Sequence, residues 1–360
     1  LLGTPWNIDQ VKRRTYNAMP VPSALTHDEY RDGSNDQVVI MNPENWKYFI
    51  ENNVKGGTPE SLFEPYKKYM VQDSMNIKEA VNFLKKKSPE KDEILKLLFG
   101  EEKYQRYNFL PVSKFVLPVN KANAIKSGII PAKDAAKAVD YITINYKRGN
   151  MFKADYMLMD ILANFDWNRP INFSTGGIYE DQNIFYLNDY LQFDGFSYRL
   201  VPIKTKETED GEMGRVDADD LYNVVKNYRW GNFKDLKVHF DETCTSNIIG
   251  YRSSASRAAE ALILEGKKSK AIEILDLASK EIPSSKYNDP RSLSSMVYGY
   301  IVAGQEQKGL QLAEQLKKDI FQEYDYYLSL SHYEQQFVKK QMGSQPILYS
   351  IVVGSVSNAY

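Results

Sequence analysis

The chain has 360 residues, of which 42% are hydrophobic, and its 46 basic and 47 acidic residues give a formal net charge of -1. This length favours two domains, each large enough to bury a core. The balanced charge excludes a general attraction to nucleic acid or to an anionic membrane, so no nucleic-acid partner is expected. Cys244 is the single cysteine in the sequence, which excludes an intrachain disulfide and a thiolate metal cluster.

The amino-terminal part alternates short apolar runs with amphipathic segments. Pro5 and the spacing of the following apolar residues predict a helix over residues 5–17, and the run 38–40 predicts a strand. Helical signals then dominate from residue 42 to about residue 110, with helices beginning near Pro43, Asn76 and Asp92. We interpret this stretch as a helical insertion with solvated Lys-rich faces.

The middle of the chain mixes strand and helix signals. Runs rich in β-branched and aromatic residues predict strands, and the segments between them predict helices. The expected strands cover 114–119, 140–146, 169–174 and 196–203, and the expected helices cover 120–128, 131–138 and 151–164. Strands interleaved with helices indicate an α/β or α+β domain over residues 1–240.

The last part of the chain, residues 245–360, is predicted to be an all-α array of helical hairpins that resemble tetratricopeptide repeats. Small residues such as Ala258 and Ala271 allow two helices to approach closely, Gly266 forms the turn, and Pro283 ends the second helix. A weaker copy follows at a shift of 38 residues. Because the standard period is about 34 residues, the loop near 284–290 must be long. An ordinary pair of hairpins without repeat ancestry remains an alternative.

Aromatic residues are concentrated after residue 316. Tyr324 and Tyr327 belong to this run and are candidate ligand-binding residues, because an exposed aromatic stripe lines a concave surface in many repeat proteins. A buried stripe would only cap the array. The apolar stretch 346–356 is expected to be a final packing helix.

No pattern of catalytic or metal-binding residues is present in the sequence. The three histidines lie far apart, and neither a phosphate-binding loop nor a Gly-x-Ser-x-Gly elbow occurs. The acidic cluster Asp217, Asp219 and Asp220 directly precedes a predicted helix, where carboxylates stabilise the first turn. We therefore predict no catalytic residue, no metal site and no cofactor.

Residues 164–174 form the densest group of aromatic and polar side chains. Trp167 and Arg169 are placed to stack on a ligand and to hydrogen-bond with it near the carboxyl end of the predicted strand, together with Asn172 and Thr175. They could equally fix the corner between a helix and a strand. Trp6 is a further candidate aromatic contact.

Five segments in order along the chain carry a resemblance to a known family: 2–12, 30–33, 155–173, 196–202 and 227–231. They resemble the extracytoplasmic C-terminal region of bacterial protein O-mannosyltransferase-like multi-spanning membrane proteins, an uncharacterised family similar to type-C glycosyltransferases. The resemblance covers about residues 1–283. In such proteins an amino-terminal membrane domain takes a sugar from a lipid-phosphate donor and carries the catalytic acid.

The resemblance implies a periplasmic accessory domain that is tethered to the inner membrane through a missing amino-terminal region. The sequence opens without Met or a charged leader, which suggests a piece of a longer protein. Such a domain would contact an acceptor protein, a glycan or a partner protein and would not itself be catalytic. Two alternatives are a free-standing tetratricopeptide-like scaffold for protein binding and a surface glycan-binding protein.

Overall fold

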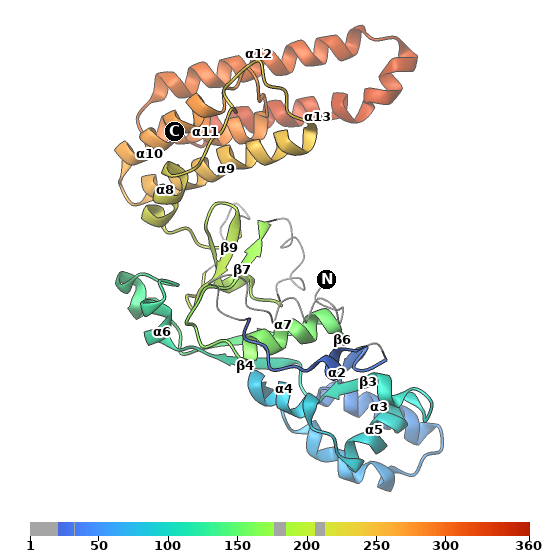
Figure 1. Cartoon of the computed structure of the whole chain (residues 1–360). Coiled ribbons are helices and arrows are strands. Elements are labelled where there is room, and N and C mark those ends of the chain that lie inside the picture. The colour runs from blue at the N-terminus through green and yellow to red at the C-terminus, as the bar shows by residue number, and fades with distance from the viewer. Residues whose placement is uncertain (1–20, 32, 176–184, 206–212) are drawn as a thin grey trace. The chain divides into compact units, whose positions relative to one another are not determined.

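A computed structural model of the chain describes residues 21–31, 33–175, 185–205 and 213–360 (Figure 1). The predicted helix over 5–17 and the candidate residue Trp6 lie outside these residues. The chain divides into two compact units. The first contains residues 1–191 and 199–213, and the second contains residues 192–198 and 214–360.

The first unit contains two small mixed sheets with the same pattern of pairing. In one sheet, β1 (Gln37–Ile40) lies between the parallel strand β3 (Tyr107–Leu110) and the antiparallel strand β6 (Asn150–Phe152). In the other, β4 (Lys114–Pro118) lies between the parallel strand β2 (Ser74–Asn76) and the antiparallel strand β5 (Tyr141–Asn145). The central strands alternate buried and part-exposed residues, so each sheet turns one face to the core.

Four α-helices of the first unit begin where the sequence supplies a side-chain cap. Asn42, Asn76, Ser88 and Asn120 each accept a backbone N–H at a helix start. The α-helices are α2 (His27–Tyr30), α3 (Pro43–Lys55), α4 (Ile77–Lys85), α5 (Pro89–Phe99), α6 (Lys121–Lys126) and α7 (Lys153–Ala163). The 3₁₀ helices are η1 (Glu60–Met70), η2 (Tyr104–Arg106) and η3 (Ala132–Lys137).

Two clusters of buried side chains form the core of this unit. The larger one joins both sheets to α4 and α7, and includes Tyr30 stacked on Tyr156 with ring centroids 5.6 Å apart. The smaller one surrounds Trp46 on α3, whose indole stacks on Tyr66 and meets Phe109 edge-on. The inner face of α3 is therefore fixed by aromatic packing, and its outer face is left for other contacts.

The stretch 42–110 contains more than helices. Strands β2 and β3 lie within it and pair with β4 and β1, so this stretch contributes to both sheets. Helix α5 begins at Pro89 behind the Ser88 cap, three residues before Asp92. Strands β2, β3 and β6 have three or four residues and contain no β-branched residue, so the local sequence pattern does not predict them.

A third sheet has the order β7 (Asn172–Ser174), β9 (Ser197–Leu200) and β8 (Leu191–Phe193). Strands β7 and β9 fall within the runs predicted over 169–174 and 196–203. The short 3₁₀ helix η6 (Asn188–Tyr190) precedes β8. Small mixed sheets with helices confirm the predicted α+β character of the amino-terminal region.

Residues 218–357 are all-helical and form packed hairpins, as predicted. Helix α8 (Ala218–Lys226) is followed by α9 (Glu242–Leu264), α10 (Lys268–Glu281), α11 (Pro290–Val302), α12 (Glu306–Ser329) and α13 (His332–Ser357). Gly266 and Gly304 connect the helices of successive hairpins with φ of +75° and +94°, a backbone conformation that favours glycine. Figure 1 shows α9 to α13 as neighbouring helices, and α12 contacts both α11 and α13.

The long loop between α10 and α11 is held by Arg252, which is completely buried on α9. Its guanidinium donates to the carbonyl oxygens of Ile282 and Tyr287 at 3.1 and 2.9 Å and to the hydroxyl of Ser292 at 3.0 Å. One buried cation thus satisfies the carbonyl oxygens of the long loop that the 38-residue shift requires.

Helix α13 runs through Pro346, whose ring leaves the carbonyl of Met342 without its helical N–H partner. The predicted packing helix over 346–356 is the second half of this longer helix. None of the helices in the described ranges combines the length and the apolar character needed to cross a membrane.

Candidate functional site

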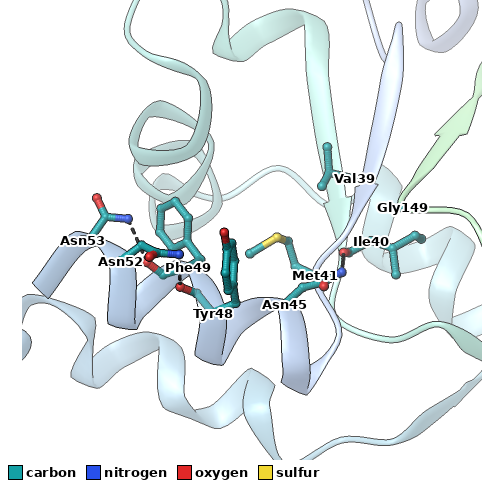
Figure 2. A pocket seen from close by; sticks show the side chains of 9 residues that line it. All are labelled: Val39, Ile40, Met41, Asn45, Tyr48, Phe49, Asn52, Asn53 and Gly149. Atoms are coloured by element: carbon teal, nitrogen blue, oxygen red, sulfur yellow. Dashed lines mark hydrogen bonds between the residues drawn. The ribbon is translucent and has the colours of Figure 1, made fainter. Parts of the chain in front are cut away.

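A pocket of about 360 Å³ opens between α3 and the strand β1 in the first unit. Figure 2 shows the ring of Tyr48 between the side chains of Phe49 and Met41 in that view. Tyr48 is 73% exposed, whereas Met41 is buried. The aromatic face of Tyr48 is therefore available to a ligand at the mouth of the pocket, and Met41 lies at its apolar base.

Three asparagine side chains line the same pocket from one side of α3. Each uses its NH₂ group within the protein: Asn45 donates to the carbonyl of Ile40 at 2.6 Å, Asn52 to that of Tyr48 at 3.0 Å, and Asn53 to that of Phe49 at 2.9 Å. Their Oδ1 atoms accept no hydrogen bond from the described residues. The amides are thus fixed with their acceptor atoms open.

The lining of this pocket contains no side chain that carries a charge at neutral pH. It consists of Val39, Ile40, Met41, Asn45, Tyr48, Phe49, Asn52, Asn53 and Gly149. A pocket with open carbonyl acceptors beside an exposed aromatic ring suits a neutral ligand that carries hydroxyl or N–H donors and has an apolar face. Charged ligands find no counter-ion in it.

This pocket was not predicted from the sequence, although the sequence of α3 contains a signal for it. Asn45, Tyr48 and Asn52 stand at a spacing of three and four residues, which places them on one side of a helix. The same helix also carries Lys47 and Lys55. Because of these lysines, its polar face was predicted to be an ordinary solvated surface. Two amides flanking an exposed tyrosine on one helix face distinguish this surface from an ordinary charged one.

Trp167 lies at the corner between α7 and β7. Its indole is 1% exposed and donates from Nε1 to the carbonyl oxygen of Pro118 at 2.9 Å. The ring also packs on Phe165, with centroids 4.7 Å apart. The hydroxyl of Ser127 donates to the Trp167 carbonyl at 2.9 Å. These contacts favour the interpretation in which Trp167 fixes the corner.

The other candidates near this corner differ in exposure. Asn172 is exposed on β7, whereas Arg169 and Thr175 are half-buried. None of them lines the pocket beside α3. Their proposed role in ligand binding stays a prediction.

Tyr324 and Tyr327 both lie on α12 in the second unit, in different surroundings. Tyr324 is half-buried and lines a pocket of about 170 Å³ between α12 and α13. Tyr327 is buried, and its hydroxyl donates to Glu323 on the same helix. The predicted aromatic run is thus divided between a pocket wall and the helix packing.

The acidic cluster before α8 has the structural role predicted for it. Asp217 caps the helix by accepting the N–H of Asp220 at 3.1 Å. Asp219 accepts from Lys267 and Lys270 at 2.6 and 2.9 Å, and these hydrogen bonds lower the pKa of its carboxyl to about 2. Within the described ranges, no group of three or more His, Cys, Asp or Glu residues is placed to hold a metal ion.

Several segments of the family resemblance meet in the structure. Tyr30 stacks on Tyr156, which joins the segments 30–33 and 155–173. Phe196 packs on Tyr228 at 5.6 Å, which joins the segments 196–202 and 227–231. These motifs therefore hold the fold together.

One comparison with known proteins gives a match. The family model described as TMEM260-associated domain 2 matches residues 1–220. Comparison with curated proteins and with solved structures gave no significant match.

Proposed function

Because the chain belongs to the TMEM260-associated domain 2 family, we propose that it serves as the accessory domain of a membrane-embedded glycosyltransferase-like protein. The family match over residues 1–220 is the observation that carries the proposal. TMEM260 is a protein O-mannosyltransferase-like membrane protein, which agrees with the resemblance drawn from the sequence motifs. In this proposal the domain faces the periplasm and is held at the inner membrane by another part of the full-length protein.

The domain is proposed to have no transferase activity of its own. In support, the clustered carboxylates near α8 are engaged in a helix cap and in ion pairs with Lys267 and Lys270. The buried carboxyl of Asp160 is likewise occupied, because it accepts the N–H of Ala24 at 3.0 Å. Incubation of the chain with a lipid-linked mannose donor and an acceptor peptide should give no mannosylated peptide above the background. Sustained turnover would contradict the proposal.

The pocket beside α3 is proposed to contact a neutral glycan of the acceptor. Sugars combine an apolar ring face, which stacks on an aromatic side chain, with hydroxyl donors that meet amide oxygens. The exposed ring of Tyr48 and the open Oδ1 atoms of Asn45, Asn52 and Asn53 supply both. The same geometry supports binding to a free glycan and does not require a protein partner.

Binding to a set of neutral and charged oligosaccharides tests this contact, with affinities measured by ligand-observed NMR on the full chain. Tyr48→Ala should weaken binding of neutral glycans about five- to thirtyfold, since stacking on one aromatic ring contributes about 1–2 kcal/mol. Tyr141→Ala is the matched control, because Tyr141 is an exposed tyrosine of the same unit on β5. An equal effect of both variants would show that the pocket is not the site.

A further inference from the structure

Strand β5 lies at an edge of its sheet, because the sheet has the order β2-β4-β5 and β5 pairs with β4 on one side. It is the longest edge strand of the two mixed sheets, with five residues against three or four in β2, β3 and β6. Ile142 and Ile144 are completely buried, whereas Tyr141, Thr143 and Asn145 are exposed. The strand thus turns one face to the core and the other to solvent.

The hydrogen bonds at the two ends of β5 show which of its backbone groups face β4. The Val119 N–H donates to the Asp140 carbonyl at 3.0 Å, and the Tyr146 N–H donates to the Ser113 carbonyl at 2.8 Å. In an antiparallel pair, residues that bond to the partner strand alternate with residues whose N–H and carbonyl groups point away from it. The even-numbered residues of β5 therefore face β4, and the odd-numbered residues face the open edge.

The odd-numbered residues form a row of free backbone groups. The N–H and carbonyl groups of Tyr141, Thr143 and Asn145 have no hydrogen-bond partner within the parts of the chain that the structure describes. Two residues before Tyr141, the Val139 N–H donates to the carbonyl of Pro202 at 2.9 Å, so this edge does pair with a neighbouring segment where one is present. Since proteins bury very few unpaired backbone groups, those of the three exposed residues are open to solvent.

Strand β5 lacks the features that usually protect a sheet edge. Such edges commonly carry a charged side chain, a proline or a bulge, which prevents pairing with another chain. The sequence of β5, Tyr-Ile-Thr-Ile-Asn, contains no charge and no proline, and each of its residues pairs with one residue of β4 without a bulge. Its β-branched residues favour the extended conformation. The edge is therefore suited to accept a further strand.

We propose that the open edge of β5 binds an extended segment of a partner polypeptide, which adds to the sheet as a further strand. Free N–H and carbonyl groups recur at every second residue, at a spacing of about 6.8 Å that matches the backbone of an extended peptide. A sugar or an acyl chain does not repeat a donor and an acceptor at this spacing. Recognition lies in the main chain of β5. The inference does not depend on the function proposed above.

The open part of the edge is short, which favours an extended segment over a second copy of the chain. Pro202 occupies the edge at Val139, so pairing is limited to the five residues of β5. A stable contact between two folded copies involves about 20–30 residues on each side. An extended segment reaches the same backbone groups without bringing further surfaces together.

The test uses the peptide acetyl-Thr-Val-Thr-Val-Thr-amide and measures amide hydrogen exchange of the full chain by NMR. With the peptide in excess, exchange at Tyr141, Thr143 and Asn145 should slow at least about tenfold, because their N–H groups become hydrogen-bonded. Exchange at Ile142 and Ile144 should change less than about twofold, since their N–H groups already face β4. The same peptide N-methylated at its three central residues lacks the donors for pairing and should leave all these rates unchanged.

Two substitutions at Thr143 separate the backbone from the side chain. Thr143→Pro removes the central outward N–H and should weaken peptide affinity about tenfold. Proline is tolerated where the N–H of an edge strand faces solvent, and thermal unfolding verifies that the variant is folded. Thr143→Val keeps the N–H and should bind the peptide with wild-type affinity.

The proposal is wrong if the outward amides exchange at the same rate with and without the peptide. It is also wrong if the N-methylated peptide protects them equally, or if Thr143→Val weakens binding as much as Thr143→Pro does. Sedimentation of the chain without peptide tests the other occupant. Self-association that Thr143→Pro abolishes would show that a second copy of the chain pairs with this edge, which would overturn the proposal.

Discussion

Trp167 has a backbone φ of +57°, which bulky residues rarely adopt, and it keeps this conformation because its indole is held on both sides. The Nε1 to Pro118 hydrogen bond and the contact with Phe165 fix the ring. The fixed side chain of Trp167 thereby sets the position of the backbone at the corner before β7. The strained backbone is stabilised by packing, and a ligand is not needed to explain it.

Trp167→Phe should therefore lower the free energy of unfolding by about 2 kcal/mol, from lost ring volume and an unpaired carbonyl at Pro118. Urea unfolding followed by circular dichroism measures this change. Glycan affinity of the folded variant should stay at the wild-type value. Loss of glycan binding with unchanged stability would instead support the ligand-stacking interpretation of Trp167.

Lys91 is a buried cation at the start of α5 that caps the end of α4. Its ammonium donates to the carbonyl oxygens of Phe83 and Leu84 at 2.8 and 3.0 Å. Burial lowers the pKa of Lys91 from 10.5 to about 7, although the nearby carboxylate of Asp92 favours the charged form and opposes this shift. The folded state therefore holds this proton less tightly than the unfolded state does.

The sign of the resulting pH dependence follows from that difference. Between about pH 7 and pH 10.5 the unfolded state binds more protons at Lys91, so its contribution to stability rises with pH, by at most about 1.4 kcal/mol per pH unit. The stability difference between wild type and Lys91→Met, measured by urea unfolding at pH 6, 7.5 and 9, should shift in favour of wild type as pH rises. A difference that is constant with pH would contradict this account.

At the scale of elements, Gly309 on α12 marks a close helix contact in the C-terminal unit. A Cβ atom at this position would lie 2.5 Å from Cγ1 of Ile301 and 3.0 Å from the carbonyl oxygen of Val297, both on α11. The two helices thus approach each other through a residue without a side chain. At the shift of 38 residues between the two hairpins, Gly309 corresponds to Ala271, so both hairpins have a small residue at this position.

Gly309→Ala should destabilise the protein by about 1–3 kcal/mol, because the helices must separate to admit the methyl group. Gly343→Ala is the matched control in α13, since its Cβ would meet nothing within 4 Å. The control should raise stability by about 0.5–1 kcal/mol through helix propensity. Thermal unfolding of the two variants should therefore give Tm changes of opposite sign.

The elements that could be predicted from the sequence are the long amphipathic helices and the helices delimited by a clear cap or turn residue. The hairpin turns at Gly266 and Gly304 and the cap at Asn76 are local signals, and the structure confirms the helices they delimit. Strands β2, β3 and β6 depend on pairing with distant segments, which a local pattern does not encode. The length of α13 was missed because Pro346 normally marks a helix end.

The candidate site was harder to predict than the fold. The aromatic ligand-binding candidates were predicted from residue type alone. Two of them, Trp167 and Tyr327, are buried in the structure. Tyr48 was not predicted, because its exposure follows from the packing of Trp46, which directs the opposite face of α3 into the core. Which aromatic side chain a fold leaves accessible is decided by tertiary packing.

At the scale of the whole molecule, the two pockets belong to separate units with different lining chemistry. We expect substitutions in the two units to act independently, because variants without shared partners have additive effects. Gly309→Ala lies in the second unit, so it should leave the glycan affinity of the pocket beside α3 unchanged although it lowers stability. Glycan titration of the folded variant measures this, and loss of glycan binding in Gly309→Ala would contradict independence.

The proposed accessory role concerns a larger protein, so it is tested most directly in membranes that contain the full-length protein. The measurement is kcat/KM for an acceptor glycopeptide, with and without Tyr48→Ala, beside the Tyr141→Ala control. We expect a decrease of about tenfold for Tyr48→Ala only, with hydrolysis of the lipid-linked donor unchanged. Unchanged acceptor use in Tyr48→Ala, or transfer catalysed by the present chain alone, would contradict it.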